Sequence, residues 1–168
     1  MDLEARVAEL ERRLAALERA GDRGVVAPAA AGDFWALEGL RARLAEAGAE
    51  AGGVLFTGSV RLPSGELFHW QDGLTADELF DRDWSDAAES FAALGHAVRL
   101  RLLREILGGR RTAAELAALD DLGTTGQIYH HLRQLTAAGW LHAAARGRYE
   151  VPPGRVVPLL VALTAAQP

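Results

Sequence analysis

The chain has 168 residues, of which 49% are hydrophobic and 24% charged, a composition typical of a soluble globular protein with one compact domain or two small ones. It contains no cysteine, which excludes a disulfide scaffold, a cysteine-ligated zinc site and a cysteine nucleophile. No apolar run approaches the roughly 20 residues that cross a bilayer, and the N-terminus is acidic (Asp2, Glu4). We therefore expect no membrane span, no signal peptide and a cytoplasmic protein.

Charge divides unevenly along the chain, and all 18 basic residues are arginine. Residues 1–94 carry nine arginines against 18 acidic residues, a net charge of −9, whereas residues 95–168 carry nine against five, a net charge of +4. The overall charge of −5 argues against a general binder of polyanions. The basic second half leaves local contact with nucleic acid open.

Residues 1–20 carry apolar side chains at alternating spacings of four and three, the heptad pattern of a coiled coil. The predicted seam, and with it a candidate dimerisation contact, consists of Leu3, Val7, Leu10, Leu14 and Leu17. The pattern also fits an amphipathic helix that packs on its own domain. Fewer than three heptads are too short to hold a dimer alone, so other contacts must contribute.

Two segments of different character follow. Residues 21–32 are rich in glycine, alanine and proline without periodicity, which predicts a flexible linker. Residues 33–88 predict a small subdomain of a helix and a β-hairpin. Its expected elements are a helix from Asp33 that ends at residues 51–53, and strands over 54–62 and 66–70 joined by a Pro63-Ser64-Gly65 turn.

Eight of the eleven aromatic residues lie between positions 33 and 91. One interpretation is that they form the core of this subdomain. The other is that they line a pocket for a small organic effector, or form a dimer face. The candidate pocket residues are Trp35, Phe56, Phe68, Trp70 and Trp84.

Residues 89–168 carry the most specific pattern. Thr112-Ala-Ala-Glu115 and Thr124-Thr-Gly-Gln127 are two capping boxes, and each opens a short helix, so the pair is typical of a helix-turn-helix. Two helices, about 84–94 and 97–107, precede the pair. A short hairpin over 140–151 and a last helix over about 155–166, with Pro158 in its first turn, follow it.

This order of elements is that of a winged helix, and the chain resembles the ArsR-type winged-helix transcriptional regulators over roughly residues 89–166. The matching motifs are Leu94-Gly95-His96-Ala97-Val98-Arg99-Leu100-Arg101-Leu102-Leu103, Thr112-Ala-Ala-Glu115-Leu116-Ala117, Ile128-Tyr129-His130-His131-Leu132-Arg133-Gln134-Leu135-Thr136-Ala137-Ala138-Gly139 and Arg146-Gly147-Arg148-Tyr149. Ala97 departs from the family, which usually has proline there. The N-terminal extension is a second departure.

The resemblance implies a dimer that places the second helix of the motif in the DNA major groove. That helix has an apolar face and a polar face, and glutamine and arginine on the polar face can pair with adenine and guanine. Arginines at the hairpin suit contact with the DNA backbone or minor groove. The candidate DNA-binding residues are Thr124, Thr125, Gln127, Tyr129, His130, Arg133, Arg146 and Arg148. We expect His131 to be packed or capped instead.

We expect the homodimer to form through the last helix, with Leu159 and Leu163, and through residues 89–94. Family members that sense metals use cysteine on the first helix of the motif, or histidine and carboxylates on the last. Here residues 116–119 and 156–166 offer none of these side chains, so we expect no metal sensing by either route, and no cofactor. His96, His130, His131 and His142 have no metal-ligand spacing.

No phosphate-binding loop, nucleophile elbow or zinc-protease motif occurs, so we do not expect an enzyme. The acidic cluster Asp81, Asp83, Asp86 and Glu89 is explained by a helix start, where acids complement the helix dipole. The sequence thus predicts an α+β, mainly α regulator that binds double-stranded DNA. The alternative is a protein-interaction module that keeps the winged fold without reading DNA.

Overall fold

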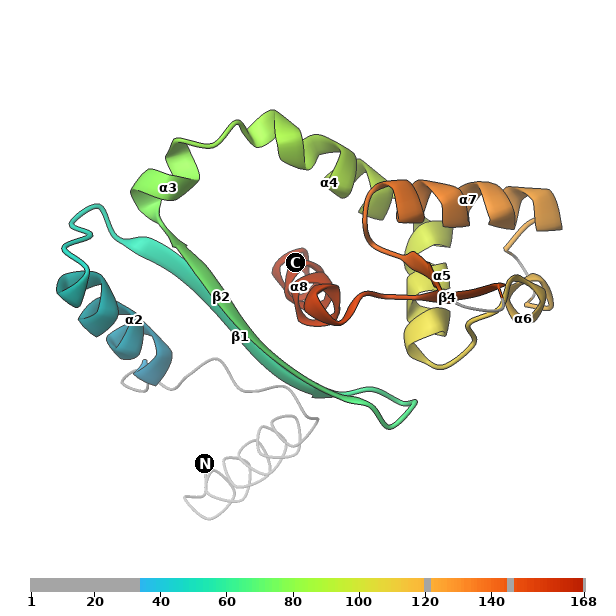
Figure 1. Cartoon of the computed structure of the whole chain (residues 1–168), viewed down its shortest axis with the longest axis horizontal. Helices are drawn as coiled ribbons and strands as arrows, with labels where there is room; N and C mark the ends of the chain where they lie inside the picture. Colours follow the sequence, from blue (N-terminus) through green and yellow to red (C-terminus); the bar gives the residue numbers. More distant parts are fainter. Residues whose placement is uncertain (1–33, 120–121, 145–146, 168) are drawn as a thin grey trace, which may run out of the picture.

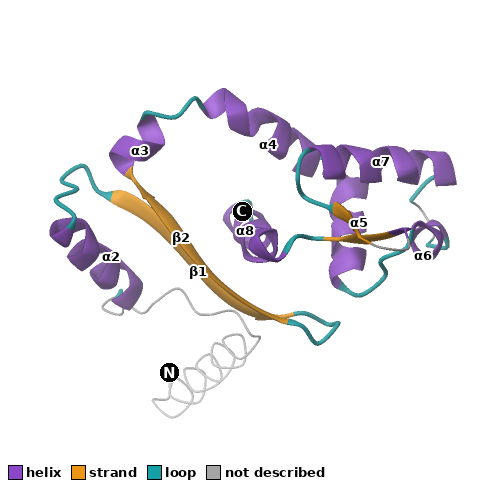
Figure 2. Cartoon of the chain, in the orientation of Figure 1, coloured by secondary structure: helices purple, strands orange, loops and turns teal. Residues whose placement is uncertain are grey.

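The computed structural model describes residues 34–119, 122–144 and 147–167, and the predicted heptad helix and linker lie outside this part of the chain. The described fold is α+β and mainly helical, as expected, with two separate antiparallel hairpins (Figures 1 and 2). A long hairpin and three short helices arch around the C-terminal helix. Among the described residues, no helix has the length and apolar character needed to span a membrane.

The first helix, α2 (Trp35–Glu46), ends earlier than predicted. Gly48 adopts φ 67°, and its N–H and that of Ala49 donate to the carbonyls of Ala45 and Leu44 at 3.2 and 2.9 Å. This Schellman motif closes the helix before the glycines at 52 and 53 are reached. The predicted end at residues 51–53 was therefore wrong, because Gly48 already supplies the left-handed backbone that terminates the helix.

The long hairpin consists of β1 (Gly53–Arg61) and β2 (Leu67–Thr75), with Gly58 opposite Trp70 and Arg61 opposite Leu67. The predicted turn is present, and Gly65 there adopts φ 93°. The second strand runs five residues past its predicted end at Trp70. The turn-favouring residues Asp72 and Gly73 in that stretch are held by pairing with β1.

The two faces of β1 contact different helices. A Cβ on Gly58 would lie 2.5 Å from Cγ1 of Val157, whereas a Cβ on Gly53 would meet Leu44 of α2 at 3.1 Å. Residues five apart on a strand point to opposite faces, so α2 and the C-terminal helix lie on opposite sides of the hairpin (Figure 1).

The arch continues through α3 (Ala76–Phe80), a 3₁₀ turn η1 (Trp84–Ala87) and α4 (Ala88–Leu94). Thr75 and Glu78 form a capping box at the start of α3. Asp83 caps η1 by accepting the Ser85 N–H at 2.9 Å, and Asp86 and Glu89 lie in the first turns of η1 and α4, as the helix-start interpretation of the acidic cluster predicts. For Asp81 that interpretation was wrong, because this residue is the C-cap of α3. The predicted helix over 84–94 is thus a 3₁₀ turn followed by an α-helix.

The next three helices are α5 (Ala97–Leu107), α6 (Ala113–Ala117) and α7 (Thr125–Ala137). Both predicted capping boxes are confirmed, Thr112 with Glu115 and Thr124 with Gln127. The helices are joined through fully buried apolar side chains. These include Leu102, Leu116, Ile128, Leu132 and Leu135.

The second hairpin, β3 (His142–Ala144) and β4 (Arg148–Glu150), is shorter than predicted, and α8 (Pro153–Ala165) follows it. Because α8 begins two residues before its predicted start, Pro158 lies in the second turn rather than the first. It therefore removes one helical hydrogen bond, to the carbonyl of Gly154.

One hydrophobic core joins the long hairpin to the C-terminal helices. Leu62 is buried in this core, and Val60 and Phe68 pack against it. Within the described part of the chain, the segment from residue 34 to residue 88 therefore shares its packing with the later helices through the hairpin.

Candidate nucleic-acid interface

Helix α7 presents one face to the core and the other to solvent. Ile128, Leu132 and Leu135 are completely buried, a spacing of four and three residues that fixes the rotation of the helix. The opposite face is exposed and includes Thr125, Gln127, Tyr129, His130 and Arg133. Helix α7 carries no carboxylate, so this face offers hydrogen-bonding groups and positive charge without repelling a phosphate backbone.

The start of α7 holds two candidate DNA-binding residues in a structural role. The Thr124 N–H donates to Oε1 of Gln127 at 2.7 Å, and the Gln127 N–H donates to Oγ1 of Thr124 at 3.4 Å. Reading adenine in a bidentate manner requires both Oε1 and Nε2 of a glutamine. The capping bond directs the Gln127 side chain back toward Thr124 at the start of the helix. Among the described residues, the side chains of Thr125, Tyr129, His130 and Arg133 on this face form no hydrogen bond that would hold them in place.

The short hairpin supplies one described arginine to the candidate interface. Arg148 is exposed at the start of β4, and it lies near enough to Glu115 to help lower the pKa of that carboxyl, after the larger effect of the Thr112 N–H hydrogen bond. The backbones of Thr112 and Arg148 also form an isolated antiparallel β-bridge, which fixes the hairpin beside the N-terminus of α6. Arg146 lies outside the described residues.

Arg99 of α5 links α4 to α7. Its Nε and Nη2 donate to the carbonyls of Ala93 and Ala92 at 2.5 and 2.7 Å, and its Nη1 donates to Oε1 of Gln134 at 2.8 Å. The side chain thus satisfies carbonyls at the end of α4, which has no intrahelical donors for them. This link holds α7 in a fixed position relative to α4.

Arg111 links the two hairpins, as Arg99 links two helices. Its guanidinium pairs with Glu66 beside the turn of the long hairpin and, at 3.1 Å, with Glu150 of β4. The side chain is 18% exposed, so both pairs are partly shielded from solvent. A hydrogen bond from Ser64 lowers the pKa of Glu66, and Arg111 adds to this effect.

Three histidines meet where α5 adjoins α7. The rings of His96 and His131 are 4.7 Å apart and those of His130 and His131 are 5.7 Å apart, and Nδ1 of His96 accepts the Val98 N–H at 3.2 Å. Nδ1 of His131 is buried and has no hydrogen-bond partner among the described residues. Burial, followed by the charge of His96, lowers the pKa of His131.

His131 is therefore packed, as expected from the sequence. Among residues 34–119, 122–144 and 147–167, no cluster of three or more histidine or carboxylate side chains is placed to hold a metal ion.

The structure does not gather the five candidate effector aromatics around one cavity. Trp35, on α2, is 69% exposed on the far side of the hairpin from Trp70, whose ring contacts Gly154 of α8. Trp84 is 61% exposed on η1. Phe68 packs against the core and Phe56 is half-buried.

The expectation that the aromatics form a subdomain core was also wrong for most of them. Six have between 40% and 70% of their surface exposed in the single chain: Phe34, Trp35, Trp70, Phe80, Trp84 and Phe91.

The two candidate dimerisation residues of α8 differ in what they offer a partner. Leu159 is completely buried in the chain's own core, whereas Leu163 is half-buried. Phe91 of α4 is 67% exposed, and it lies in the other segment predicted to contact a partner. The heptad residues Leu3, Val7, Leu10, Leu14 and Leu17 lie outside the described part of the chain.

Comparison of the chain with protein-family models, with curated proteins and with solved structures finds no match. Its function is therefore inferred from its own residues.

Proposed function

We propose that the chain is a non-catalytic regulator of the winged-helix type that reads double-stranded DNA as a homodimer. The observation that carries this proposal is α7: a capped, 13-residue helix, locked to the core on one face and exposing Tyr129, His130 and Arg133 without any carboxylate on the other. A helix of this kind fits the major groove, where Arg133 can pair with guanine. Its N-terminus favours phosphate.

Two neighbouring features support the same function. Arg148 extends the positive surface to the short hairpin, which follows α7 as the wing does in a winged helix. Arg99 and Arg111 hold α7 and this hairpin to the rest of the fold, so the candidate groups are presented from a rigid body. Rigid presentation raises binding affinity because less conformational freedom is lost on association.

The direct test of this interface is DNA binding by fluorescence anisotropy over a range of salt, with duplexes enriched by the protein from a random library. Replacing Arg148 by alanine should weaken binding to all duplexes about equally and reduce the slope of log K against log salt by about 1. Replacing Arg133 by alanine should weaken binding to the selected duplexes by about 1–3 kcal/mol and relax the preference for guanine at one position. Arg43→Ala, the same change on the distant helix α2, is the matched control and should leave both quantities unchanged. Unaltered binding by Arg133→Ala would contradict the proposal.

The homodimer is proposed to use Phe91, which is exposed on α4 in the segment predicted to contact a partner. Two thirds of the Phe91 side chain is exposed in the single chain, so a partner that covers it would remove apolar surface from water. Phe91→Ser should therefore shift the sedimentation coefficient toward that of a monomer, and its melting temperature should no longer rise with protein concentration. Trp35→Ser, an equally exposed aromatic on α2, should leave the dimer intact.

The exposed aromatics of α2 favour one alternative, a protein-interaction module. Phe34 and Trp35 are 53% and 69% exposed, and α2 has no buried residue. Under this alternative the chain would show no preference among duplex sequences, and Arg133→Ala would change nothing. Partner binding would instead be lost in Trp35→Ser.

A further inference from the structure

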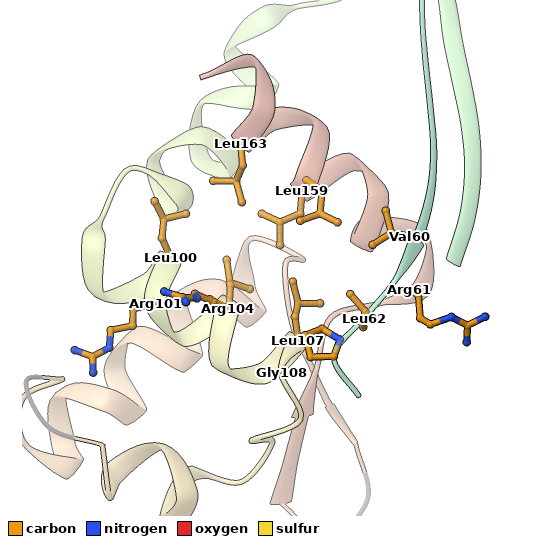
Figure 3. Close-up of a pocket in the computed structure, with 13 residues that line it drawn as sticks. Val60, Arg61, Leu62, Leu100, Arg101, Arg104, Leu107, Gly108, Leu159 and Leu163 are labelled. Atoms are coloured by element: carbon orange, nitrogen blue, oxygen red, sulfur yellow. The ribbon is translucent and has the colours of Figure 1, made fainter. Parts of the chain in front are cut away.

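A pocket lies between the turn of the long hairpin, α5 and α8, away from the exposed aromatic residues. Its volume is about 580 Å³, within the range of about 300–1,000 Å³ common for small-molecule sites. Figure 3 shows Val60 and Leu62 of the hairpin, Leu100 and Leu107 of α5, and Leu159 and Leu163 of α8 surrounding it.

The charged side chains that line this pocket are all positive. They are Arg61, Arg101 and Arg104, and no aspartate or glutamate lines it. Arg61 and Arg101 extend outward from opposite edges in Figure 3. Among the described residues, none of the three forms an ion pair, whereas Arg110 and Arg111 nearby are both paired with glutamates. The pocket therefore combines an apolar interior with an unneutralised positive rim.

We propose that this pocket binds a small amphipathic anion, with an apolar body against the leucines and a carboxylate head at Arg101 and Arg104. The apolar body would remove leucine surface from water, which drives binding. The head would form charge-assisted hydrogen bonds with guanidinium groups, whose planar geometry matches a carboxylate. A neutral analogue loses the second contribution, and a cationic one is repelled.

The pocket also adjoins the candidate DNA-reading helix through α5. Leu100 and Leu103 line the pocket from α5, and Arg99, on the same helix, donates to Gln134 of α7. A ligand that displaces α5 would thus move α7. That this changes DNA affinity rests on the proposed function, whereas ligand binding does not.

Binding is tested by titrating the full chain calorimetrically with decanoate, decan-1-ol and decyltrimethylammonium, with helix content followed by circular dichroism. We expect saturable binding of one decanoate per chain and binding of the other two at least about tenfold weaker. The double variant Arg101→Gln/Arg104→Gln should weaken decanoate binding by about tenfold or more. Arg41→Gln/Arg43→Gln, two similar changes on α2, should not weaken it.

Four results of the titrations would overturn the proposal, and a fifth concerns self-association. They are the absence of saturable binding, equal affinity for the three probes, decanoate binding that survives loss of both arginines, and loss of helix content on titration. Self-association that excludes decanoate would likewise overturn it, because the occupant would then be a second copy of the chain.

A Leu163→Trp variant checks the location independently, since a larger side chain should occupy the pocket and abolish binding. A DNA titration with and without decanoate separates the two claims. If the chain binds decanoate saturably but does not bind DNA, the proposed ligand site is supported and the proposed function is contradicted.

Discussion

The close approach of the long hairpin to α8 makes a quantitative prediction for Gly58→Ala. An added Cβ would lie 2.5 Å from Cγ1 and 3.3 Å from Cγ2 of Val157, whose side chain is 1% exposed and cannot move into solvent. Overpacking of this kind costs about 1–3 kcal/mol. Replacing glycine in a strand recovers about 0.5–1 kcal/mol. We therefore expect a net loss of about 1–2 kcal/mol in the free energy of unfolding.

The same contact predicts rescue by a second substitution. Val157→Ala alone removes two buried methyl groups and should cost about 2 kcal/mol, from reduced burial and the remaining cavity. In the double variant the new methyl at position 58 occupies part of that space. The loss should therefore be at least about 1 kcal/mol smaller than the sum of the two single losses.

Urea unfolding of the full chain followed by circular dichroism measures all four free energies of this cycle. Gly39→Ala on α2 is the control, because its added Cβ meets nothing within 4 Å. It should stabilise the chain or leave it unchanged. Additive effects of Gly58→Ala and Val157→Ala would refute the contact, and so would a Gly58→Ala variant as stable as the original chain.

Three further predictions concern α7 and the contacts that hold it. Arg99→Met leaves two carbonyls of α4 and Oε1 of Gln134 without their donor. Water can reach two of these three acceptors, so the free energy of unfolding in urea should fall by about 1–2 kcal/mol. Thr124→Ala removes the N-cap of α7 and should cost about 1 kcal/mol, whereas Thr124→Ser should cost much less. Because the pKa of His131 is lowered below its ordinary 6.5, the unfolded chain takes up a proton first as the pH falls. Stability should therefore decrease as the pH drops through 6.5 toward the folded-state pKa, and His131→Gln should flatten that decrease in melts at pH 5 to 8. An equally steep decrease in His131→Gln would assign it to other groups.

Local signals made much of the fold predictable from the sequence. The capping boxes at Thr112 and Thr124 and the turn at Gly65 depend on residues within a few positions of one another, and all three are present. The same signal, Thr75 followed by Glu78, starts α3 and could have predicted that helix. The ends of the elements were less predictable. Helix α2 is closed by Gly48 rather than at residues 51–53, and α8 begins early enough to place Pro158 in its second turn.

The contacts that hold the candidate sites together join residues far apart in the chain. Arg111 meets Glu66 across 45 positions and Arg99 meets Gln134 across 35, and neither pair has a periodic signature. The proposed anion pocket is likewise assembled from three elements. Aromatic content predicted a core or pocket in residues 33–91. Whether an aromatic side chain is buried, however, depends on which surfaces of the hairpin are covered by helices, and the sequence pattern does not specify that arrangement.

The central claim is that α7 reads duplex DNA, and sequencing of duplexes selected by the full chain from a random library tests it most directly. We predict two symmetric half-sites whose centres lie about 10–10.5 base pairs, or a multiple of this, apart. The same selection with Arg133→Ala should lose its preference at one position in each half-site, where a guanine is expected. An unenriched library, or a motif that Arg133→Ala leaves unchanged, would contradict the claim.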